Sequence, residues 1–205
     1  KAGLSEERLC KADSAISDAI ARGEIPGAVL GIVRRGQMAY LKAYGNRQVY
    51  PTLEPMSTET VFDMASCSKS MSTAICVMKL CEDGRLRLTD PVADYVPGFQ
   101  NWMDTNGETE IIRIKHLLTH TSGLPAYASV DALSKKYGSP NPKALLEHIC
   151  QMKRGFCPGT DFRYSCLNYI TLQHIVQNIT GLSLREYAQA NIFRPLGMKH
   201  TDYLP

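Results

Sequence analysis

Two strand-like segments near the start of the chain limit what it can fold into, because little that follows them can complete a sheet. Residues 28–33 and 38–44 are rich in β-branched and aromatic side chains, and the Arg-Arg-Gly-Gln stretch at 34–37 favours a hairpin turn between them. A two-stranded hairpin by itself is only marginally stable in water. No convincing strand follows residue 60, so we expect the hairpin to need further strands.

The remaining segments have mainly helical patterns separated by Gly and Pro. Residues 5–22 carry apolar side chains at helical spacing and end at Gly23, whereas residues 51–60 are expected to form a loop. A short turn or helix is expected to begin near residue 89 and end at Pro97. The other expected helices are residues 66–82, with a buried face made of Met71, Ala74, Ile75 and Met78, and residues 114–118, 142–152, 167–179 and 183–193.

Composition excludes several classes of protein. The chain has 205 residues, of which 44% are hydrophobic and 21% charged, which is typical of one sizeable soluble domain or two small ones. The net charge of +3 comes from scattered residues with no basic stripe, so we expect no nucleic-acid partner. The longest apolar stretch, residues 28–33, is too short for a transmembrane segment. No signal-peptide pattern opens the chain, and a start at Lys1 leaves its compartment open.

The seven cysteines are expected to be buried thiols. Their number is odd, and none forms a Cys-x-x-Cys pair. The spacing of the His and Cys residues at 148, 150, 157, 166 and 174 matches no structural zinc pattern. We therefore expect neither a metal nor a cofactor.

One tetrapeptide, Ser66-Cys67-Ser68-Lys69, has a spacing that could support nucleophilic catalysis. Residues i and i+3 share a helix face, so the amine of Lys69 would lie within reach of the Ser66 hydroxyl. A serine becomes a good nucleophile when a neighbouring base removes its proton, and a lysine can do so if burial lowers its pKa. The tetrapeptide alone favours the simpler interpretation, a helix-capping serine and a solvated lysine.

The surrounding segments resemble the serine β-lactamase and penicillin-binding protein family, especially its class C-like β-lactamase and esterase branch. Residues 61–70 resemble the nucleophile segment of that family, and residues 80–97 the segment that follows it. The run His-Leu-Leu-Thr-His-Thr-Ser-Gly-Leu at 116–124 is close to a signature of the same branch. Residues 158–165 resemble the approach to the second catalytic motif, Tyr-x-Asn, and residues 196–201 a stretch after it. The resemblance covers most of residues 10–205, with its pieces in family order.

The resemblance assigns roles to individual residues. It implies that Ser66 is the nucleophile, that Lys69 activates it, and that Tyr164 moves protons to and from the nucleophile and the leaving group. The motif asparagine is replaced by Cys166, and Asn168 lies two residues further on. These two residues and Tyr127, which is placed to line the cleft, are the substrate-binding candidates.

Two histidines in the signature run are expected to be mainly architectural. Although His116 and His120 invite a general-base interpretation, the resemblance implies a structural role for the run. The thiol of Cys67, beside the nucleophile, is expected to be packed rather than reactive.

The implied fold is an α/β (α+β) fold of the β-lactamase/transpeptidase type, with an antiparallel sheet flanked by helices and an inserted helical domain. Residues 1–60 would hold the N-terminal helix and first two strands, and residues 61–205 the helical domain with the Ser-x-x-Lys and Tyr motifs. The third motif of the family, Lys or His followed by Thr or Ser and Gly, is absent before Pro205. We therefore expect an incomplete sheet and an N-terminal part of a longer protein, lacking full activity without its C-terminal part.

The implied function is that of a serine hydrolase with an acyl-enzyme on Ser66. The substrate would be a small-molecule ester, a D-amino-acid peptide or a β-lactam, and Cys166 favours esterase or peptidase action because a thiol is a weak hydrogen-bonding group. One alternative is a catalytically silent penicillin-binding-like protein that binds peptidoglycan fragments, and another is a truncated product without activity. The resemblance alone suggests a periplasmic or secreted bacterial protein.

Overall fold

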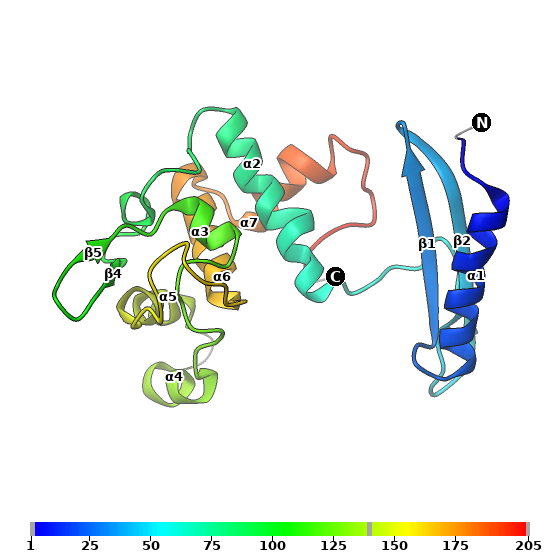
Figure 1. The fold of residues 1–205 in the computed structure, drawn as a ribbon, viewed down its shortest axis with the longest axis horizontal. Coiled ribbons are helices and arrows are strands. Elements are labelled where there is room, and N and C mark those ends of the chain that lie inside the picture. Colours follow the sequence, from blue (N-terminus) through cyan, green and yellow to red (C-terminus); the bar gives the residue numbers. More distant parts are fainter. Residues whose placement is uncertain (1–2, 139–140, 204–205) are drawn as a thin grey trace. The chain divides into compact units, whose positions relative to one another are not determined.

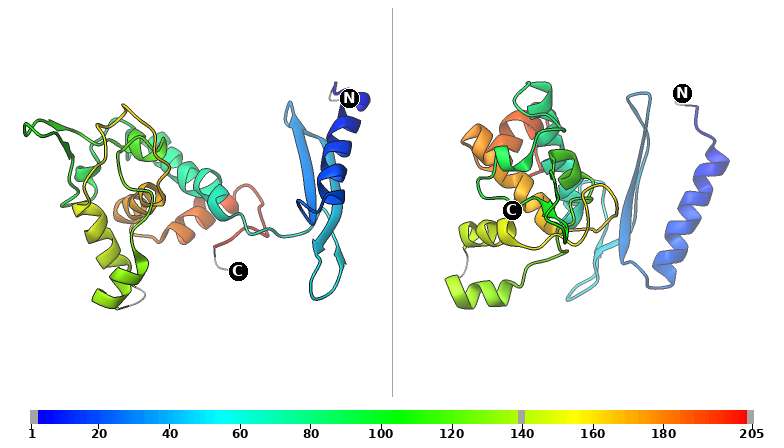
Figure 2. Two further views of the ribbon diagram at one scale, coloured as in Figure 1. Left: turned by 60° about the horizontal axis from the view of Figure 1, so that its bottom comes forward. Right: turned by 60° about the vertical axis from the view of Figure 1, so that its left-hand side comes forward.

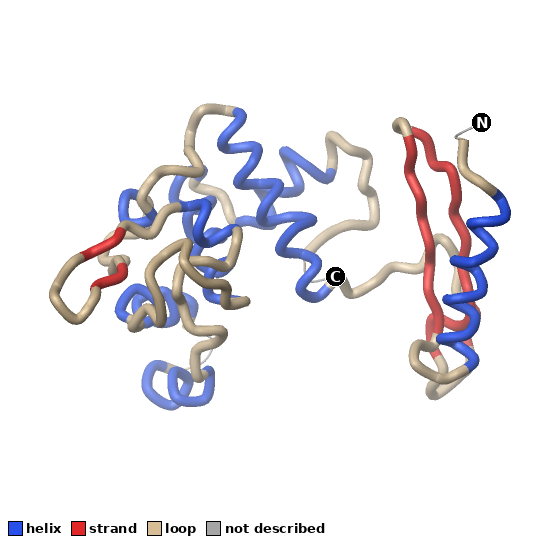
Figure 3. The backbone as a smooth tube through the Cα atoms, viewed as in Figure 1, coloured by secondary structure: helices blue, strands red, loops and turns tan. Residues whose placement is uncertain are grey.

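The computed structural model of the chain describes residues 3–138 and 141–203. It divides into two compact units, Lys1–Asp63 and Met64–Pro205, close to the boundary expected after residue 60. The long strands (red in Figure 3) belong to the first unit, whereas the described part of the second unit consists mainly of helices and loops. Within the described ranges, none of the helices is both long enough and apolar enough to span a membrane.

The first unit is a helix against a three-stranded antiparallel sheet. It consists of α1 (Glu6–Ala21), β1 (Gly27–Arg34), β2 (Gln37–Gln48) and β3 (Glu54–Pro55), with strand order β1-β2-β3. The expected helix and hairpin are confirmed, whereas the short β3 lies in a segment expected to be a loop. Pairing of Val29 with Ala43 sets the register of the hairpin. The helix α1 runs alongside this hairpin (Figures 1 and 2).

One carboxylate fastens α1 to β2. Asp13 accepts hydrogen bonds from the hydroxyls of Tyr40 and Tyr44, and the Nζ atom of Lys42 lies 3.0 Å from its Oδ2 atom. The three partners are every second residue of β2, so their side chains lie on the same face of the sheet. The hydrogen bond from Tyr40, followed by those from Tyr44 and Lys42, lowers the pKa of Asp13 to about 2.

The second unit is a cluster of helices with one small hairpin. Its regular elements are α2 (Ala74–Glu82), β4 (Trp102–Met103), β5 (Thr109–Glu110), α3 (Ile114–Leu118), α4 (Val130–Tyr137), α5 (Pro142–Gln151), α6 (Cys166–Thr180) and α7 (Leu184–Ala188). The helices expected near α3, α5, α6 and α7 are confirmed, as is a short 3-10 turn at Val92–Asp94. Analysis of the sequence missed α4 and the β4–β5 hairpin.

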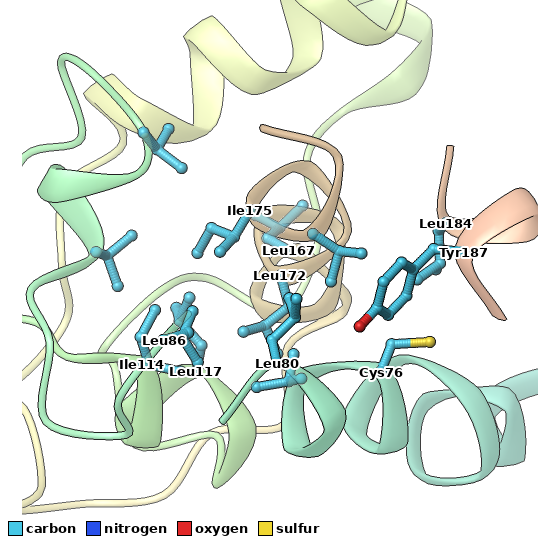
Figure 4. Close-up of a cluster of buried hydrophobic side chains, with 14 of the residues drawn as sticks. Cys76, Leu80, Leu86, Ile114, Leu117, Leu167, Leu172, Ile175, Leu184 and Tyr187 are labelled. Atoms are coloured by element: carbon cyan, nitrogen blue, oxygen red, sulfur yellow. The ribbon is translucent and has the colours of Figure 1, made fainter. Parts of the chain in front are cut away.

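A continuous apolar core holds the second unit together (Figure 4). Its members come from α2, α3, α5, α6, α7 and the loops between them, and Leu80, Leu117, Leu172 and Ile175 are fully buried in it. Burial of a leucine side chain contributes about 1.5–3 kcal/mol to folding. Because α2 and α6 share this core, the segments next to these two helices are fixed relative to each other.

The prediction of which side chains are buried in the helix at 66–82 is wrong in part. Met71 is 46% exposed and Met78 60% exposed, whereas Cys76, Val77 and Leu80 are buried. The segment does not form one uniform helix, since a 3-10 turn at Ala65–Cys67 and a π-helical turn at Lys69–Thr73 precede α2. The buried residues Thr73, Cys76, Val77 and Leu80 also have α-helical spacing, so the core covers a neighbouring face of this segment and leaves Met71 and Met78 outside it.

Candidate active site

The Ser-x-x-Lys pair lies at the tight turns before α2. Ser66 is in the 3-10 turn, Lys69 begins the π-helical turn, and the Nζ atom of Lys69 donates a hydrogen bond of 3.2 Å to Ser66 Oγ. Ala65, directly before the serine, has a φ of +41°, a left-handed conformation that is strained for alanine. The structure therefore brings the expected nucleophile and amine together at a strained turn.

Tyr164 reaches the same point from the loop that precedes α6. The Nζ atom of Lys69 is 5.1 Å from the centre of its ring, and interactions of its phenol with Lys69 and Ser66 shift its pKa. The three side chains expected to carry catalysis thus converge from two segments about 100 residues apart in sequence. They all belong to the second unit.

The electrostatic interaction between Lys69 and Tyr164 favours a charged lysine and a more acidic phenol. The hydrogen bond from Lys69, followed by that from Ser66, lowers the pKa of Tyr164 below its ordinary value. Desolvation by burial lowers the pKa of Lys69, but bonds and charge interactions with Tyr164 and Cys166 together outweigh it and raise that pKa. The condition under which Lys69 would itself be the base, a pKa lowered by burial, is not met. The interaction thus lowers the pKa of Tyr164 and raises that of Lys69.

Cys166 lies beside Lys69, where the motif asparagine is expected. Its side chain is one of the groups that raise the pKa of Lys69. The backbone N–H of Cys166 donates to the carbonyl of Ala126 at 3.1 Å, which holds the chain next to Tyr127 near the start of α6. The Tyr127 side chain itself is 67% exposed, and its contact with substrate stays a prediction.

Asn168 is not brought to the reactive side chains. It is 0% exposed, and both ends of its amide are bonded within the protein: Oδ1 accepts from Ser122 Oγ at 2.6 Å, and Nδ2 lies 3.1 Å from His120 Nδ1. The structure therefore makes Asn168 part of a buried network instead of a group available to substrate. Its position on α6, two residues after Cys166, already pointed away from the cleft.

The two histidines of the signature run have different surroundings. His116 is buried at the start of α3, where its Nδ1 atom accepts a hydrogen bond of 3.1 Å from the backbone N–H of Arg113. His120 packs its ring against Tyr164, with centroids 4.6 Å apart. This contact has no signal in the sequence, because the two residues belong to separate segments.

The described residues offer no gathering of three or more His, Cys, Asp or Glu side chains that could hold a metal ion. All seven cysteines, each within the described ranges, are free thiols. Two of them, Cys76 and Cys150, are buried, whereas Cys67 and Cys10 are exposed. The expectation that Cys67 is packed is therefore wrong, since the turn at Ala65–Cys67 carries no buried residue.

The chain is similar to known proteins of one family in sequence and in fold. A sequence model of the family described as Beta-lactamase matches residues 12–205. Protein flp of Staphylococcus aureus strain MW2 is 36% identical over 203 residues, covering 98% of this chain and 39% of that protein. EstCE1, described as a hydrolase with promiscuous acyltransferase activity, is 29% identical with a TM-score of 0.77, covering 93% of this chain and 52% of that one.

A third similar protein is the octameric penicillin-binding protein homologue from Pyrococcus abyssi. Its structure is 31% identical with a TM-score of 0.73, covering 93% of this chain and 43% of that one. The chain thus spans between 39% and 52% of these three proteins, in agreement with the missing third motif. The chain belongs to the Beta-lactamase family of serine hydrolases and has part of its α/β fold.

Proposed function

We propose that the protein containing this chain is a serine hydrolase that forms an acyl-enzyme on Ser66, with Tyr164 as its base and acid. The observation that carries the proposal is the convergence of three groups: Lys69 Nζ lies 3.2 Å from Ser66 Oγ and 5.1 Å from the centre of the Tyr164 ring. A nucleophile bonded to a base, with a third group holding that base, is the arrangement that nucleophilic catalysis requires.

In the proposed reaction, Ser66 Oγ attacks the carbonyl carbon of the substrate while its proton passes to the Tyr164 phenolate. The tetrahedral intermediate then collapses, and Tyr164 returns the proton to the leaving group. A water molecule attacks the acyl-enzyme in the second half, again giving its proton to Tyr164, which finally reprotonates Ser66 Oγ. The Lys69 ammonium favours the phenolate throughout by its charge.

Esters are the substrate class that the site favours. A motif asparagine would offer an amide that both donates to and accepts from a substrate amide, whereas the Cys166 thiol does both only weakly. Amide substrates therefore lose recognition at this position, while an ester has no N–H to satisfy. We expect hydrolysis of short-chain esters to exceed that of β-lactams.

The test uses the full-length protein that contains this chain, treated with a fluorophosphonate and with a penicillin and weighed by intact-mass spectrometry. A covalent adduct that is lost in Ser66→Ala is expected with the fluorophosphonate, together with a fall in p-nitrophenyl ester turnover of about 10³-fold or more. Ser70→Ala is the matched control, since the Ser70 hydroxyl lies in the same segment and donates to the carbonyl of Cys67.

Ester turnover that survives in Ser66→Ala would exclude the mechanism. A full-length protein that is folded by circular dichroism but takes up no label would favour a silent binding protein. Acylation of Ser66 by the penicillin at a rate equal to its acylation by the p-nitrophenyl ester would contradict the proposed preference for esters.

A further inference from the structure

His120 lies against the catalytic phenol and is used by none of the steps above. Its ring centroid is 4.6 Å from that of Tyr164, with the planes inclined by 40°, and 5.3 Å from that of Tyr169. Phe162 meets its edge at 6.1 Å. The imidazole is therefore enclosed by aromatic rings from the segment that carries Tyr164 and from α6.

The Nδ1 atom of His120 accepts two hydrogen bonds. One comes from the backbone N–H of Ser165, at 3.2 Å, and the other from the Asn168 amide, at 3.1 Å. The orientation of that amide is fixed, because its Oδ1 atom accepts from Ser122 Oγ and its Nδ2 atom must therefore face the imidazole. His120 thus holds its lone pair on Nδ1 and its ring hydrogen on Nε2.

The backbone of His120 completes the contact on the other side of the tyrosine. Its carbonyl accepts a hydrogen bond of 3.0 Å from the backbone N–H of Arg163. The residues immediately before and after Tyr164 are therefore both bonded to one residue, Arg163 to the carbonyl and Ser165 to the imidazole. His120 adopts a φ of +59°, a left-handed conformation that is uncommon outside glycine but less so for histidine and asparagine.

These contacts exclude a general-base role for His120 through Nδ1, since that lone pair is already shared by two donors. They also distinguish it from His116, which accepts from the start of its own helix and caps it. Every polar contact of the His120 side chain on the described chain goes to the segment at 165–168, which directly follows the catalytic phenol.

We propose that His120 is a positioning residue, whose Nδ1 and carbonyl hold the residues on either side of Tyr164 and so set the phenol against Ser66 and Lys69. The inference rests on the proposed function, because it assigns a task within the same site. Misplacement of a reacting group by about 1 Å can lower a rate by about 100-fold. Loss of the Nδ1 acceptor is therefore expected to reduce kcat and to leave KM nearly unchanged.

Two substitutions at His120 separate the acceptor from the ring. His120→Asn keeps an acceptor at the same position along the side chain and tolerates the left-handed backbone, but removes the ring. His120→Phe keeps a ring and removes the acceptor. We expect His120→Phe to lower kcat for a p-nitrophenyl ester by about 10- to 100-fold, and His120→Asn to stay within a few-fold of the natural protein.

The second readout is the pH profile of kcat, normalised to active sites titrated with the fluorophosphonate. The titratable groups around the Tyr164 phenol include Lys69, Cys166, His120 and Tyr169. A phenol displaced from the Lys69 ammonium regains a higher pKa, so the acid limb of His120→Phe is expected to move to higher pH. His116→Asn is the matched control, which is expected to lower stability and to leave the acid limb in place.

The outcomes are distinguishable from failure of the proposed function. Turnover that persists in Ser66→Ala overturns the function itself. Loss of turnover in Ser66→Ala, with a natural kcat and acid limb in His120→Phe, overturns only the role of His120. Equal impairment of the Asn and Phe variants also overturns it, since keeping the acceptor in His120→Asn would then give no rescue. Should the Phe variant fail to fold, His120→Ala is expected to give the same displacement of the acid limb, and an unchanged limb overturns the proposal.

Discussion

At the scale of single residues, the charge of Lys69 decides how the site handles protons. Its ammonium sits next to the phenol of Tyr164 and within 3.2 Å of the nucleophile. A tyrosine has an ordinary pKa near 10 and is a useful base at neutral pH only if a cation stabilises its phenolate. The fall in the pKa of Tyr164 and the rise in that of Lys69 are two consequences of one interaction.

Removal of that cation should therefore change the pH dependence as well as the rate. The base must be ionised to act, so turnover rises with pH through the pKa of Tyr164. In Lys69→Ala, we expect kcat/KM to fall by about 10²-fold or more at pH 7 and the acid limb of the remaining activity to move to higher pH. The measurement is ester hydrolysis of the full-length protein from pH 6 to about 10.5, a range chosen around the ordinary pKa of tyrosine.

Lys79→Ala provides the control for this prediction. Lys79 lies on α2 and forms surface ion pairs with Glu82 and Asp83, at 2.9 Å and 2.8 Å. Its removal should leave both the rate and the acid limb unchanged. An acid limb that stays in place in Lys69→Ala would show that the titrating base is a group other than Tyr164.

At the scale of elements, the signature run at 116–124 serves as a backbone support for the segment that carries Tyr164. Gly155, Gly159 and Arg163 donate their N–H groups to the carbonyls of Gly123, Thr121 and His120, at 2.8, 2.9 and 3.0 Å. The two segments therefore pair along much of their length without forming a regular strand. The run at 116–124 thus supports one particular loop, the one that ends at Tyr164.

Gly123 is the position at which this pairing is closest. Its φ is +79°, and a Cβ atom added there would lie 2.5 Å from the carbonyl oxygen of Phe156. Gly123→Ala should lower the free energy of unfolding by about 2–4 kcal/mol, as the sum of left-handed strain and a backbone clash. Urea unfolding of the 205-residue chain followed by circular dichroism measures the change.

Gly181→Ala is the matched comparison for the clash. Gly181 ends α6 with a φ of +72°, but an added Cβ atom would have no neighbour within 4 Å. The strain alone should cost about 1–2 kcal/mol. Equal losses in the two variants would mean that the segment at 155–156 moves away freely, which the close pairing argues against.

At the scale of the whole molecule, the site depends on the core of the second unit. Lys69 leads into α2 and Tyr164 precedes α6, and both helices bury side chains in the same apolar cluster. The π-helical turn in which Lys69 lies also contributes the buried Ser72 and Thr73. Core packing, more than any contact between the catalytic groups, therefore fixes the distance between the two segments.

A cavity in that core should weaken stability and labelling together. Leu172→Ala, at a fully buried position of α6, should lower the free energy of unfolding by about 2–5 kcal/mol. Fluorophosphonate labelling of Ser66 in the full-length protein should be lost at a correspondingly lower urea concentration. Leu196→Ala, at a position 69% exposed in this chain, should change the unfolding of the 205-residue chain by about 0.5 kcal/mol or less. Labelling that outlasts the unfolding of Leu172→Ala would separate the site from this core.

The sequence by itself determined the local features and singled out the candidate reactive groups. The hairpin at β1 and β2 and the helix Ile114–Leu118 follow from patterns within a few residues of one another. The assignment of Ser66, Lys69 and Tyr164 came from short motifs, and the geometry brings these three together. Short-range periodicity and motif spacing contain this information because each is set within one stretch of chain.

Only the tertiary structure decided the features that depend on distant segments or on irregular turns. The contact of His120 with the residues around Tyr164 depends on backbone hydrogen bonds between two loops, which leave no periodic trace in either. The burial of Asn168 depends on that same network, and the face of the segment at 66–82 that is buried depends on the other helices that share its core, which leaves Met71 and Met78 exposed. The pKa of Lys69 rises because Tyr164 and Cys166 arrive from elsewhere in the chain, and burial alone would have lowered it.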